Sequence, residues 1–222
     1  MISQKFTELD LLIEYGVPKK EQKQARELVH TFGHDPLAIN IFHSFYSSLP
    51  EAVEECITGL VLLERHQGQM LFLVKTSRSS YFYHANHDHA EYGGSPREGL
   101  REDILHFYGF ATQKSFEKKH GDFTGLAPYS PDFITSKVCP VCYCLEGELH
   151  EFGCPLEVCP WCKGQLISCP CRFTQLGVGE ISTEAQLAQL QELAHKKGRI
   201  VFDAASQRPA YPTAGDESTE TQ

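Results

Sequence analysis

The cysteines of this chain are concentrated in one short stretch, residues 139–171. It reads CPVCYCLEGELHEFGCPLEVCPWCKGQLISCPC and holds eight of the nine cysteines, together with His150. Two Cys-Pro-x-Cys pairs, Cys139/Cys142 and Cys159/Cys162, are separated by a spacer of the length found between the paired cysteines of zinc sites. The stretch therefore constrains the fold strongly, because thiols this close in sequence are typical of metal binding or disulfide pairing.

The N-terminal residues favour metal binding over disulfides. Met1–Tyr15 carries charges at Lys5, Glu8, Asp10 and Glu14 and has no long apolar run, unlike a signal peptide or membrane anchor. We therefore expect a cytoplasmic location, where cysteines are thiols or metal thiolates. Residues 138–173 are too few to bury an adequate core without a disulfide or a bound metal. A structural zinc ion can supply the missing stability, since zinc binding contributes about 10–16 kcal/mol to folding of such segments.

Two closed tetrahedral sites need eight ligands, and the stretch offers nine. The favoured arrangement is sequential, with one ion held by Cys139, Cys142, His150 and Cys154 and the other by Cys159, Cys162, Cys169 and Cys171. The alternative is a zinc ribbon, in which the two Cys-Pro-x-Cys pairs share one ion and the second ion takes Cys154, Cys169, Cys171 and either His150 or Cys144. A weak internal repeat favours the sequential arrangement, since Gly147-Glu148-Leu149 precedes His150 as Gly164-Gln165-Leu166 precedes Cys169. Either arrangement predicts two zinc ions, with Cys144 as an additional candidate ligand.

The two pairs differ in the residues that follow them. Lys163-Gly164 supplies a residue that tolerates a left-handed turn, whereas Tyr143-Cys144 does not. The run CPxC, GxLHxxGC and ExCPxCxGQLISCxC resembles a cysteine-rich zinc-binding module of uncharacterised bacterial proteins. The resemblance covers about residues 139–171 and implies metal binding without an activity. Such modules have glycine where this chain has Tyr143, which leaves the role of Cys144 open.

Other chemistry of the stretch is less favoured. Cys-Pro-Trp-Cys resembles the glutaredoxin motif, which needs a helix behind the first thiol, but the strand-like Gln165-Leu166-Ile167 follows here. An iron–sulfur cluster would use four thiolates, and His150 fits zinc better. A catalytic zinc needs an open position and a nearby base. Acidic residues are close in sequence at Glu146, Glu148, Glu151 and Glu157, yet nine ligands for two ions indicate closed sites.

A second stretch, Tyr83–Glu91, is rich in histidine. His87 and His89 would share one face of an extended chain, with Asp88 opposite and His84 nearby at a strand end. Two or three histidines with a carboxylate can hold a hydrolytic metal. The simpler interpretation is a polar loop beside a sheet packed with aromatic residues, and it is favoured because no matching second ligand cluster is evident.

The rest of the chain predicts helices followed by a small sheet. Apolar periodicity predicts helices over residues 3–16, 18–32 and 37–49. Extended apolar runs predict an antiparallel meander of strands at residues 56–63, 70–74 and 80–84. A capping box from Ser95 to Glu98 predicts a helix over residues 95–108. Residues 111–136 are expected to be a loop-rich connector, 183–198 a helix with Leu187, Leu190 and Ala194 inward, and 199–202 a short strand.

These elements predict an α+β fold with four parts. They are a helix and β-meander domain over residues 1–130, a zinc-ribbon-like cysteine module over 131–176, a C-terminal helix and strand over 177–212, and a disordered tail over 213–222. The chain has 222 residues, 41% of them hydrophobic and 11% aromatic, enough to form a core. The longest apolar runs have only strand length, so no membrane span is expected.

Composition also bounds the function. The net charge of −9 disfavours a general nucleic-acid binder. We therefore predict a zinc-binding protein whose module is structural and supports recognition of a protein partner, with the acidic module suited to a basic partner surface. One alternative is a metal-dependent hydrolase at His84, His87, Asp88 and His89. Another is a nucleic-acid accessory protein that uses the basic faces at residues 19–26 and 195–199. No oligomeric state is predicted.

Overall fold

The computed structural model describes residues 2–50, 53–130 and 137–208 of the chain. Three helices open it: α1 (Ile2–Gly16), α2 (Gln22–Thr31) and α3 (Pro36–Ser48). The periodicity of the sequence predicted all three. Leu9 and Ile13 of α1 are fully buried, and the Asp35 side chain caps α3 by accepting a hydrogen bond from the Leu37 N–H at 2.9 Å.

An antiparallel sheet follows in the order β1-β2-β3-β4-β5. Its strands are β1 (Ile57–His66), β2 (Gln69–Thr76), β3 (Ser80–Ala85), β4 (Ala90–Ser95) and β5 (Gly99–Leu100). The first three match the predicted meander, because short connections between apolar runs lead to sequential antiparallel pairing. The fourth and fifth strands were not predicted.

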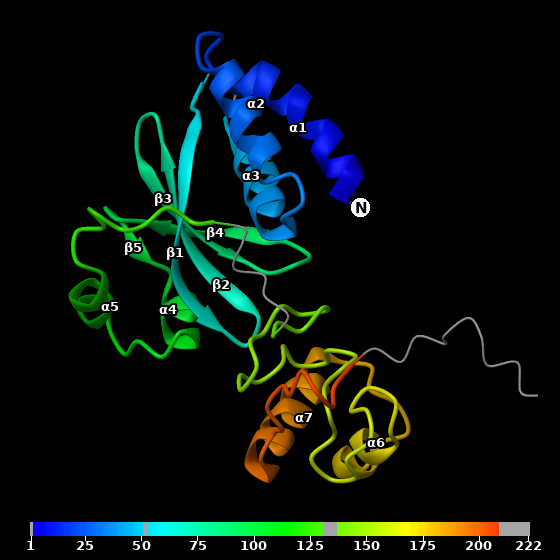
Figure 1. Cartoon of the computed structure of the whole chain (residues 1–222). Coiled ribbons are helices and arrows are strands. Elements are labelled where there is room, and N and C mark those ends of the chain that lie inside the picture. The colour runs from blue at the N-terminus through cyan, green and yellow to red at the C-terminus, as the bar shows by residue number, and fades with distance from the viewer. Residues whose placement is uncertain (1, 51–52, 131–136, 209–222) are drawn as a thin grey trace, which may run out of the picture.

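Both faces of the sheet are buried, which explains why β2 is apolar throughout. Met70, Phe72 and Val74 face a core shared with α1, α2 and α3, while Leu71 and Leu73 face a second core. Successive side chains of β2 point to opposite faces of the sheet, so one strand contributes to two cores. The second core is covered by α4 (Glu102–Phe107) and α5 (Gln113–His120), on the side of the sheet opposite to α1–α3 (Figure 1).

The predicted helix over residues 95–108 is wrong in its first half. Ser95 and Glu98 make one of the two contacts of a capping box, since Ser95 Oγ accepts from the Glu98 N–H at 3.3 Å. The Glu98 carboxylate accepts from the Ser95 hydroxyl at 3.1 Å, in place of the backbone N–H that a capping box uses. These contacts instead close the turn between β4 and β5, and the helix begins only at Glu102. The Ser95–Glu98 motif is therefore compatible with a helix N-terminus and with a hairpin turn. The pairing of β4 with β5 selects the turn.

Other boundaries also differ. The predicted connector contains α5, whose N-terminus is capped reciprocally by Thr112 and Ser115. The predicted strand at residues 199–202 is only an isolated bridge between Leu149 and Val201. In α7 (Glu184–Lys197), Leu190 and Ala194 are buried as predicted, but Leu187 is 48% exposed. The predicted tail and part of the connector, residues 213–222 and 131–136, lie outside the described residues.

The cysteine-rich residues lie against the tip of the β1–β2 hairpin (Figure 1). Gly68 in that turn has φ +77, and a Cβ built there would lie 2.1 Å from the Cys142 carbonyl oxygen. The Arg65 guanidinium also donates to the Tyr143 carbonyl at 2.8 Å, and Gln69 donates to Glu151 at 2.7 Å. The backbones meet so closely that only glycine fits at the hairpin tip.

Within the described residues, no helix is both long and apolar enough to cross a bilayer.

We expect Gly68→Ala to destabilise the protein more than Gly109→Ala does. Both glycines have left-handed φ, +77 and +80, but nothing lies within 4 Å of a Cβ at Gly109. Gly109→Ala should therefore show only the backbone penalty of about 1–2 kcal/mol. Gly68→Ala should lose at least about 1 kcal/mol more, because the hairpin and the Cys142 carbonyl must separate. Denaturant unfolding of both variants measures the difference, and equal losses would contradict the contact.

Candidate metal centres

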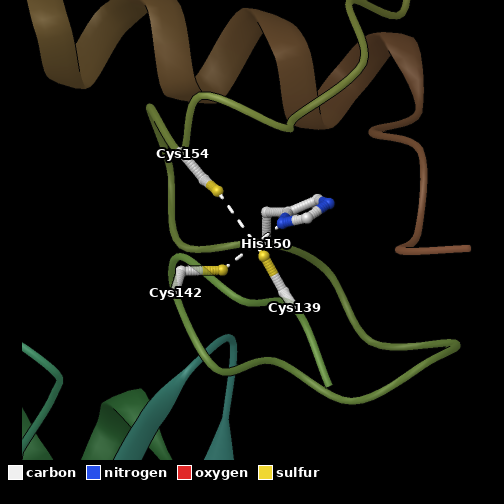
Figure 2. Close-up of side chains that lie close together, drawn as sticks. All are labelled: Cys139, Cys142, His150 and Cys154. Carbon is white, nitrogen blue, oxygen red and sulfur yellow. Dashed lines mark hydrogen bonds between the residues drawn. The ribbon is translucent and has the colours of Figure 1, made fainter. Parts of the chain in front are cut away.

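Four side chains form the first centre (Figure 2). The ligand atoms of Cys139, Cys142, His150 and Cys154 all lie within 4.8 Å of one another. The sulfurs of Cys139 and Cys154 are 3.9 Å apart, and the Cys142 sulfur is 3.3 Å from His150 Nδ1. Ligands at the usual zinc–sulfur distance of about 2.3 Å form a tetrahedron with edges of about 3.8 Å. The side chains are therefore spaced as a tetrahedral ion requires, and all four are buried.

A glutamine fixes the orientation of the histidine. His150 Nε2 lies 2.7 Å from the Gln207 side-chain oxygen, while the Gln207 amide nitrogen donates to the Val201 carbonyl at 3.0 Å. Since the glutamine oxygen only accepts, the Nε2 proton points to it, so Nδ1 is the nitrogen that faces the sulfurs and binds an ion once it has lost its proton. Metal-binding histidines commonly donate their second nitrogen in this way. Sequence analysis missed Gln207, which is 57 residues from its partner.

The second centre contains only thiols. Cys159, Cys162, Cys169 and Cys171 also place their sulfurs within 4.8 Å of one another. Cys159 and Cys169 are buried, but Cys162 is exposed and Cys171 is half-buried. The helix α6 (Cys171–Leu176) begins at the last of them. The first centre is therefore enclosed, whereas the second one lies at the surface.

The two Cys-Pro-x-Cys turns have the same backbone path. In the first, the Tyr143 N–H donates to the Cys139 carbonyl at 3.0 Å, and in the second the Lys163 N–H donates to the Cys159 carbonyl at 3.0 Å. Tyr143 and Lys163 both take left-handed φ, +61 and +65. The expectation that Tyr143 could not serve this turn was wrong. The turn places the left-handed residue directly after the second cysteine, so Gly164 was not needed for it.

Cys144 occupies the position in the first turn that Gly164 has in the second. Each accepts, through its carbonyl, the N–H of the first cysteine of its own turn, at 2.8 and 2.7 Å respectively. The Cys144 side chain is fully buried and its sulfur lies 3.5 Å from His150 Nδ1. The first centre therefore has a fourth sulfur, beside the three sulfurs and one nitrogen that converge.

A buried arginine joins both centres to the sheet. Arg199 pairs with Glu157 at 2.7 Å, and the two side chains are 2% and 1% exposed. The same guanidinium donates to the His150 carbonyl and, at 2.9 Å, to Gln67 in the β1–β2 turn. Glu157 also accepts the Gly153 N–H at 3.1 Å. Glu157 is one of the acidic residues in the sequence of the module, but it is buried and paired with Arg199, so it adds no charge to the surface.

The protonation of the ligands follows from their surroundings. Burial disfavours the charged form of His150, but the sulfurs of Cys139 and Cys142 outweigh burial and raise the pKa of His150 to about 10 in the ion-free chain. At the second centre, the backbone N–H of Gly164 and the Cys171 thiol donate to the Cys162 sulfur, which lowers the pKa of Cys162 to about 7. Zinc binding near neutral pH must therefore displace protons at both centres.

The observed grouping is the sequential one. Each Cys-Pro-x-Cys pair lies with the two ligands that follow it, and the described residues do not bring the two pairs to one point as the ribbon arrangement requires. In addition, the nearest helix after Cys159 starts at Cys171, so the described chain places no helix N-terminus behind the Cys-Pro-Trp-Cys motif.

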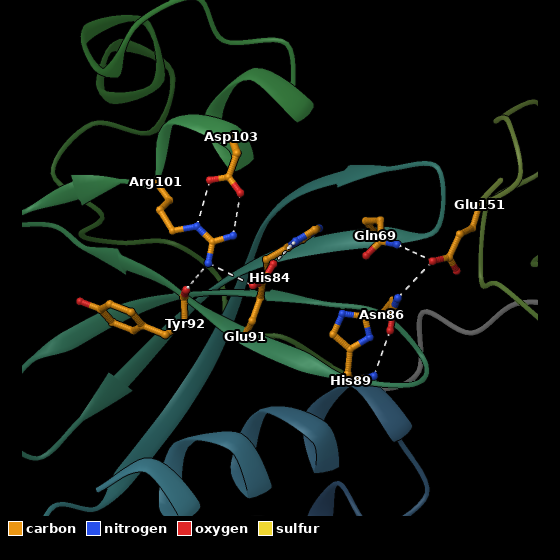
Figure 3. Close-up of polar contacts among 9 residues, drawn as sticks. All are labelled: Gln69, His84, Asn86, His89, Glu91, Tyr92, Arg101, Asp103 and Glu151. Atoms are coloured by element: carbon orange, nitrogen blue, oxygen red, sulfur yellow. Dashed lines mark hydrogen bonds and ion pairs between the residues drawn. The ribbon is translucent and has the colours of Figure 1, made fainter. Parts of the chain in front are cut away.

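The histidine stretch does not form a comparable group among the described residues. Figure 3 shows its His84, with Glu91, and its Asn86 and His89. His84 Nδ1 lies 3.4 Å from Glu91, His87 Nε2 lies 3.2 Å from Asp88, and His89 is exposed. Asn86 shapes the loop by accepting the N–H groups of Asp88 and His89 at 2.9 and 3.0 Å. Its amide donates to Glu151 at 3.2 Å, which links the loop to the cysteine-rich residues. Among the described residues, only the two cysteine groups gather metal-binding atoms.

No family model, curated protein or solved structure matches this chain. The resemblance of residues 139–171 to a cysteine-rich zinc-binding module is therefore carried only by the two groups of ligands.

We expect serine variants to remove the two ions separately. Cys139→Ser with Cys142→Ser removes two thiolates from the first centre, so metal analysis should find about one zinc per chain. Adding Cys159→Ser should remove the second ion, because this residue belongs to the other group. Under the ribbon arrangement the triple variant would instead keep about one zinc.

Cys56→Ser is the matched control for these variants, because Cys56 is buried among the apolar side chains beside β1 and belongs to neither group. It should keep both ions. Loss of zinc from this control would indicate that unfolding, and not the loss of a ligand, explains the other results.

We expect a chelator to empty the second centre first. Its Cys162 is exposed, whereas all four ligands of the first centre are buried. At limiting chelator, mass spectrometry should find one retained zinc and iodoacetamide labelling at Cys162 before Cys139 or Cys142. Since the pKa of Cys162 is lowered to about 7, its labelling rate should rise between about pH 6 and 8, below the range of an ordinary thiol. Equal labelling of the two groups would contradict this order.

Proposed function

We propose that this chain is a zinc-binding protein whose two ions are structural and whose zinc module supports recognition of a protein partner. The observation that carries the proposal is the convergence of four ligand atoms at each of two points. Soft thiolate ligands favour zinc over magnesium or calcium, and a set of three thiolates with one imidazole is typical of structural zinc. Each turn is closed by an antiparallel bridge, at Val138–Leu145 or Val158–Gln165, and these bridges support the ribbon-like form proposed for the module.

The closed ligand sets support a structural role for the ions. A catalytic zinc uses three protein ligands and leaves a position for water, whereas each of these groups offers four. Two acidic side chains of the module are also engaged elsewhere. Glu157 is paired with Arg199, and Glu151 accepts from Gln69 and Asn86 of the sheet domain. Both carboxylates are therefore committed to structural contacts.

Recognition of a partner is proposed for the outer surface formed by the module and the C-terminal residues beside it. Because Glu151 and Glu157 are engaged internally, the module presents fewer acidic charges to a basic partner than its sequence indicates. Leu187 and Val201, 48% and 45% exposed, offer apolar surface there. Exposed apolar side chains mark sites of protein contact where they gather into a patch. Cytoplasmic location remains part of the proposal, because reduced thiols are needed to bind the ions.

We expect Leu187→Glu to reduce capture of a partner without changing the zinc content. Leu187 projects from α7, and a charge there opposes an apolar contact. Leu11→Glu on α1 is the matched control, since Leu11 is 57% exposed and belongs to the helical domain. Proteins captured from lysate by the wild type, the two variants and the Cys139/Cys142 serine variant are compared. Capture that persists in Leu187→Glu and after loss of zinc would contradict the partner role.

A further inference from the structure

A cavity of 480 Å³ lies on the helical side of the sheet, far along β3 from the cysteine-rich residues. It is bounded by the end of α3, the chain leading into β1, and the strands β3 and β4. Four aromatic side chains line it: Phe45, Tyr81, Tyr83 and Tyr92. The volume is within the range of about 300–1,000 Å³ found for small-molecule sites.

The aromatic rings are inclined to one another and form walls. Tyr83 and Tyr92 are cross-strand partners with ring centroids 6.1 Å apart at 77°. Tyr81 lies 6.3 Å from Tyr92 at 59°, on the same face of β3 as Tyr83. Phe45 of α3 completes the set, with centroids 5.8 Å from Tyr81 and 6.4 Å from Tyr83. None of these pairs is stacked face to face. Phe45 and Tyr83 are almost fully buried, at 4% and 2% exposed, whereas Tyr92 is 44% exposed.

The cavity has one acidic group. Glu55 is only 4% exposed, yet its side chain lines the cavity. The Tyr81 hydroxyl donates to its carboxylate at 3.1 Å, and the Thr76 hydroxyl donates as well. A carboxylate can accept about four hydrogen bonds, so it retains acceptor capacity beyond these partners. The described residues that line the cavity include no lysine, arginine or histidine.

The tyrosines remain neutral phenols near neutral pH. Burial raises the pKa of Tyr83 to about 12, and burial together with the Glu98 carboxylate raises the pKa of Tyr92 to about 12. The Tyr92 hydroxyl donates to Glu98, and the Tyr81 hydroxyl donates to Glu55. Both hydroxyls are thus bound by carboxylates. Tyr81 and Tyr92 are the two rings with surface exposed to a ligand, since Phe45 and Tyr83 are buried.

We propose that this cavity binds a small organic cation with a quaternary or alkylated ammonium head group. The negative faces of aromatic rings attract a cation, and their apolar surface suits its alkyl groups. The Glu55 carboxylate lies close by, and the low dielectric of a buried site strengthens its attraction for a cation. An anion would be repelled by Glu55, and a neutral apolar molecule would gain nothing from it. This inference goes beyond the proposed function and does not depend on the zinc ions.

The test compares two ligands of the same shape. Choline is a quaternary ammonium compound, and 3,3-dimethylbutan-1-ol replaces its nitrogen by carbon and so lacks the charge. Each is titrated into the zinc-loaded full chain at constant ionic strength, and binding is followed by NMR shifts of the aromatic side chains. We expect saturable choline binding at least about tenfold tighter than that of the alcohol. Equal affinities, or no saturable shifts of the cavity tyrosines, would overturn the proposal.

Variants locate the binding site. Tyr92→Ala removes a wall that is 44% exposed and should weaken choline binding by about tenfold, whereas Tyr92→Phe keeps the ring and should bind as the wild type does. Tyr15→Ala, at an 82% exposed tyrosine on α1, is the matched control and should change nothing. Glu55→Gln keeps the side-chain shape and should bring choline close to the affinity of the alcohol. Choline binding that is unaffected by Tyr92→Ala and Glu55→Gln would overturn the assignment to this cavity.

Discussion

The guanidinium of Arg199 is the contact on which the arrangement of the C-terminal residues depends. It reaches three parts of the chain that are far apart in sequence: Glu157 between the two centres, the His150 carbonyl in the first centre, and Gln67 at the hairpin tip. Its pair with Glu157 is almost fully buried. Removing one partner of such a pair typically costs about 3–5 kcal/mol, because the other charge is left uncompensated. The contact therefore fixes both the internal shape of the module and its place on the sheet.

The two ligand groups and this ion pair stabilise the cysteine-rich residues in the way that an apolar core stabilises a larger domain. The clusters of buried side chains in the module are small and consist largely of the cysteines themselves, with Leu156, Leu166 and Phe202 as the main apolar members. Without ions, several thiols and an imidazole would be packed together with no favourable charge balance. An ion bound at each centre would neutralise the thiolates and fix the turns. Arg199 can then align two turns that are already rigid.

The sequence predicted what depends on short spacing. Ligand identities follow from Cys-Pro-x-Cys, and α1, α2, α3 and α7 follow from apolar periodicity, because both signals act within a few residues. Gln207 and Arg199 could not be found this way, because they contact His150 from 57 and 49 residues away along the chain. The Ser95–Glu98 motif led to a wrong helix start. Its local hydrogen bond from the Glu98 N–H to Ser95 Oγ suits a hairpin turn as well as a helix N-terminus. The left-handed Tyr143 shows that a turn held by hydrogen bonds and by ligands can impose a conformation that residue preference alone would reject.

The aromatic cavity and the zinc module are attached to the same strand. Tyr81 and Tyr83 of β3 line the cavity, and Asn86, just after its end, donates to Glu151 of the module. Between them the pairing of β3 with β2 runs without a break from Lys75–Ser80 to Met70–Ala85. Coupling between two sites requires an element with two alternative arrangements, and an unbroken ladder between two buried cores offers none. The cation and the zinc ions are therefore expected to bind independently. The strand acts as a rigid support that carries the aromatic cavity along its length and contacts the cysteine-rich residues just after its end.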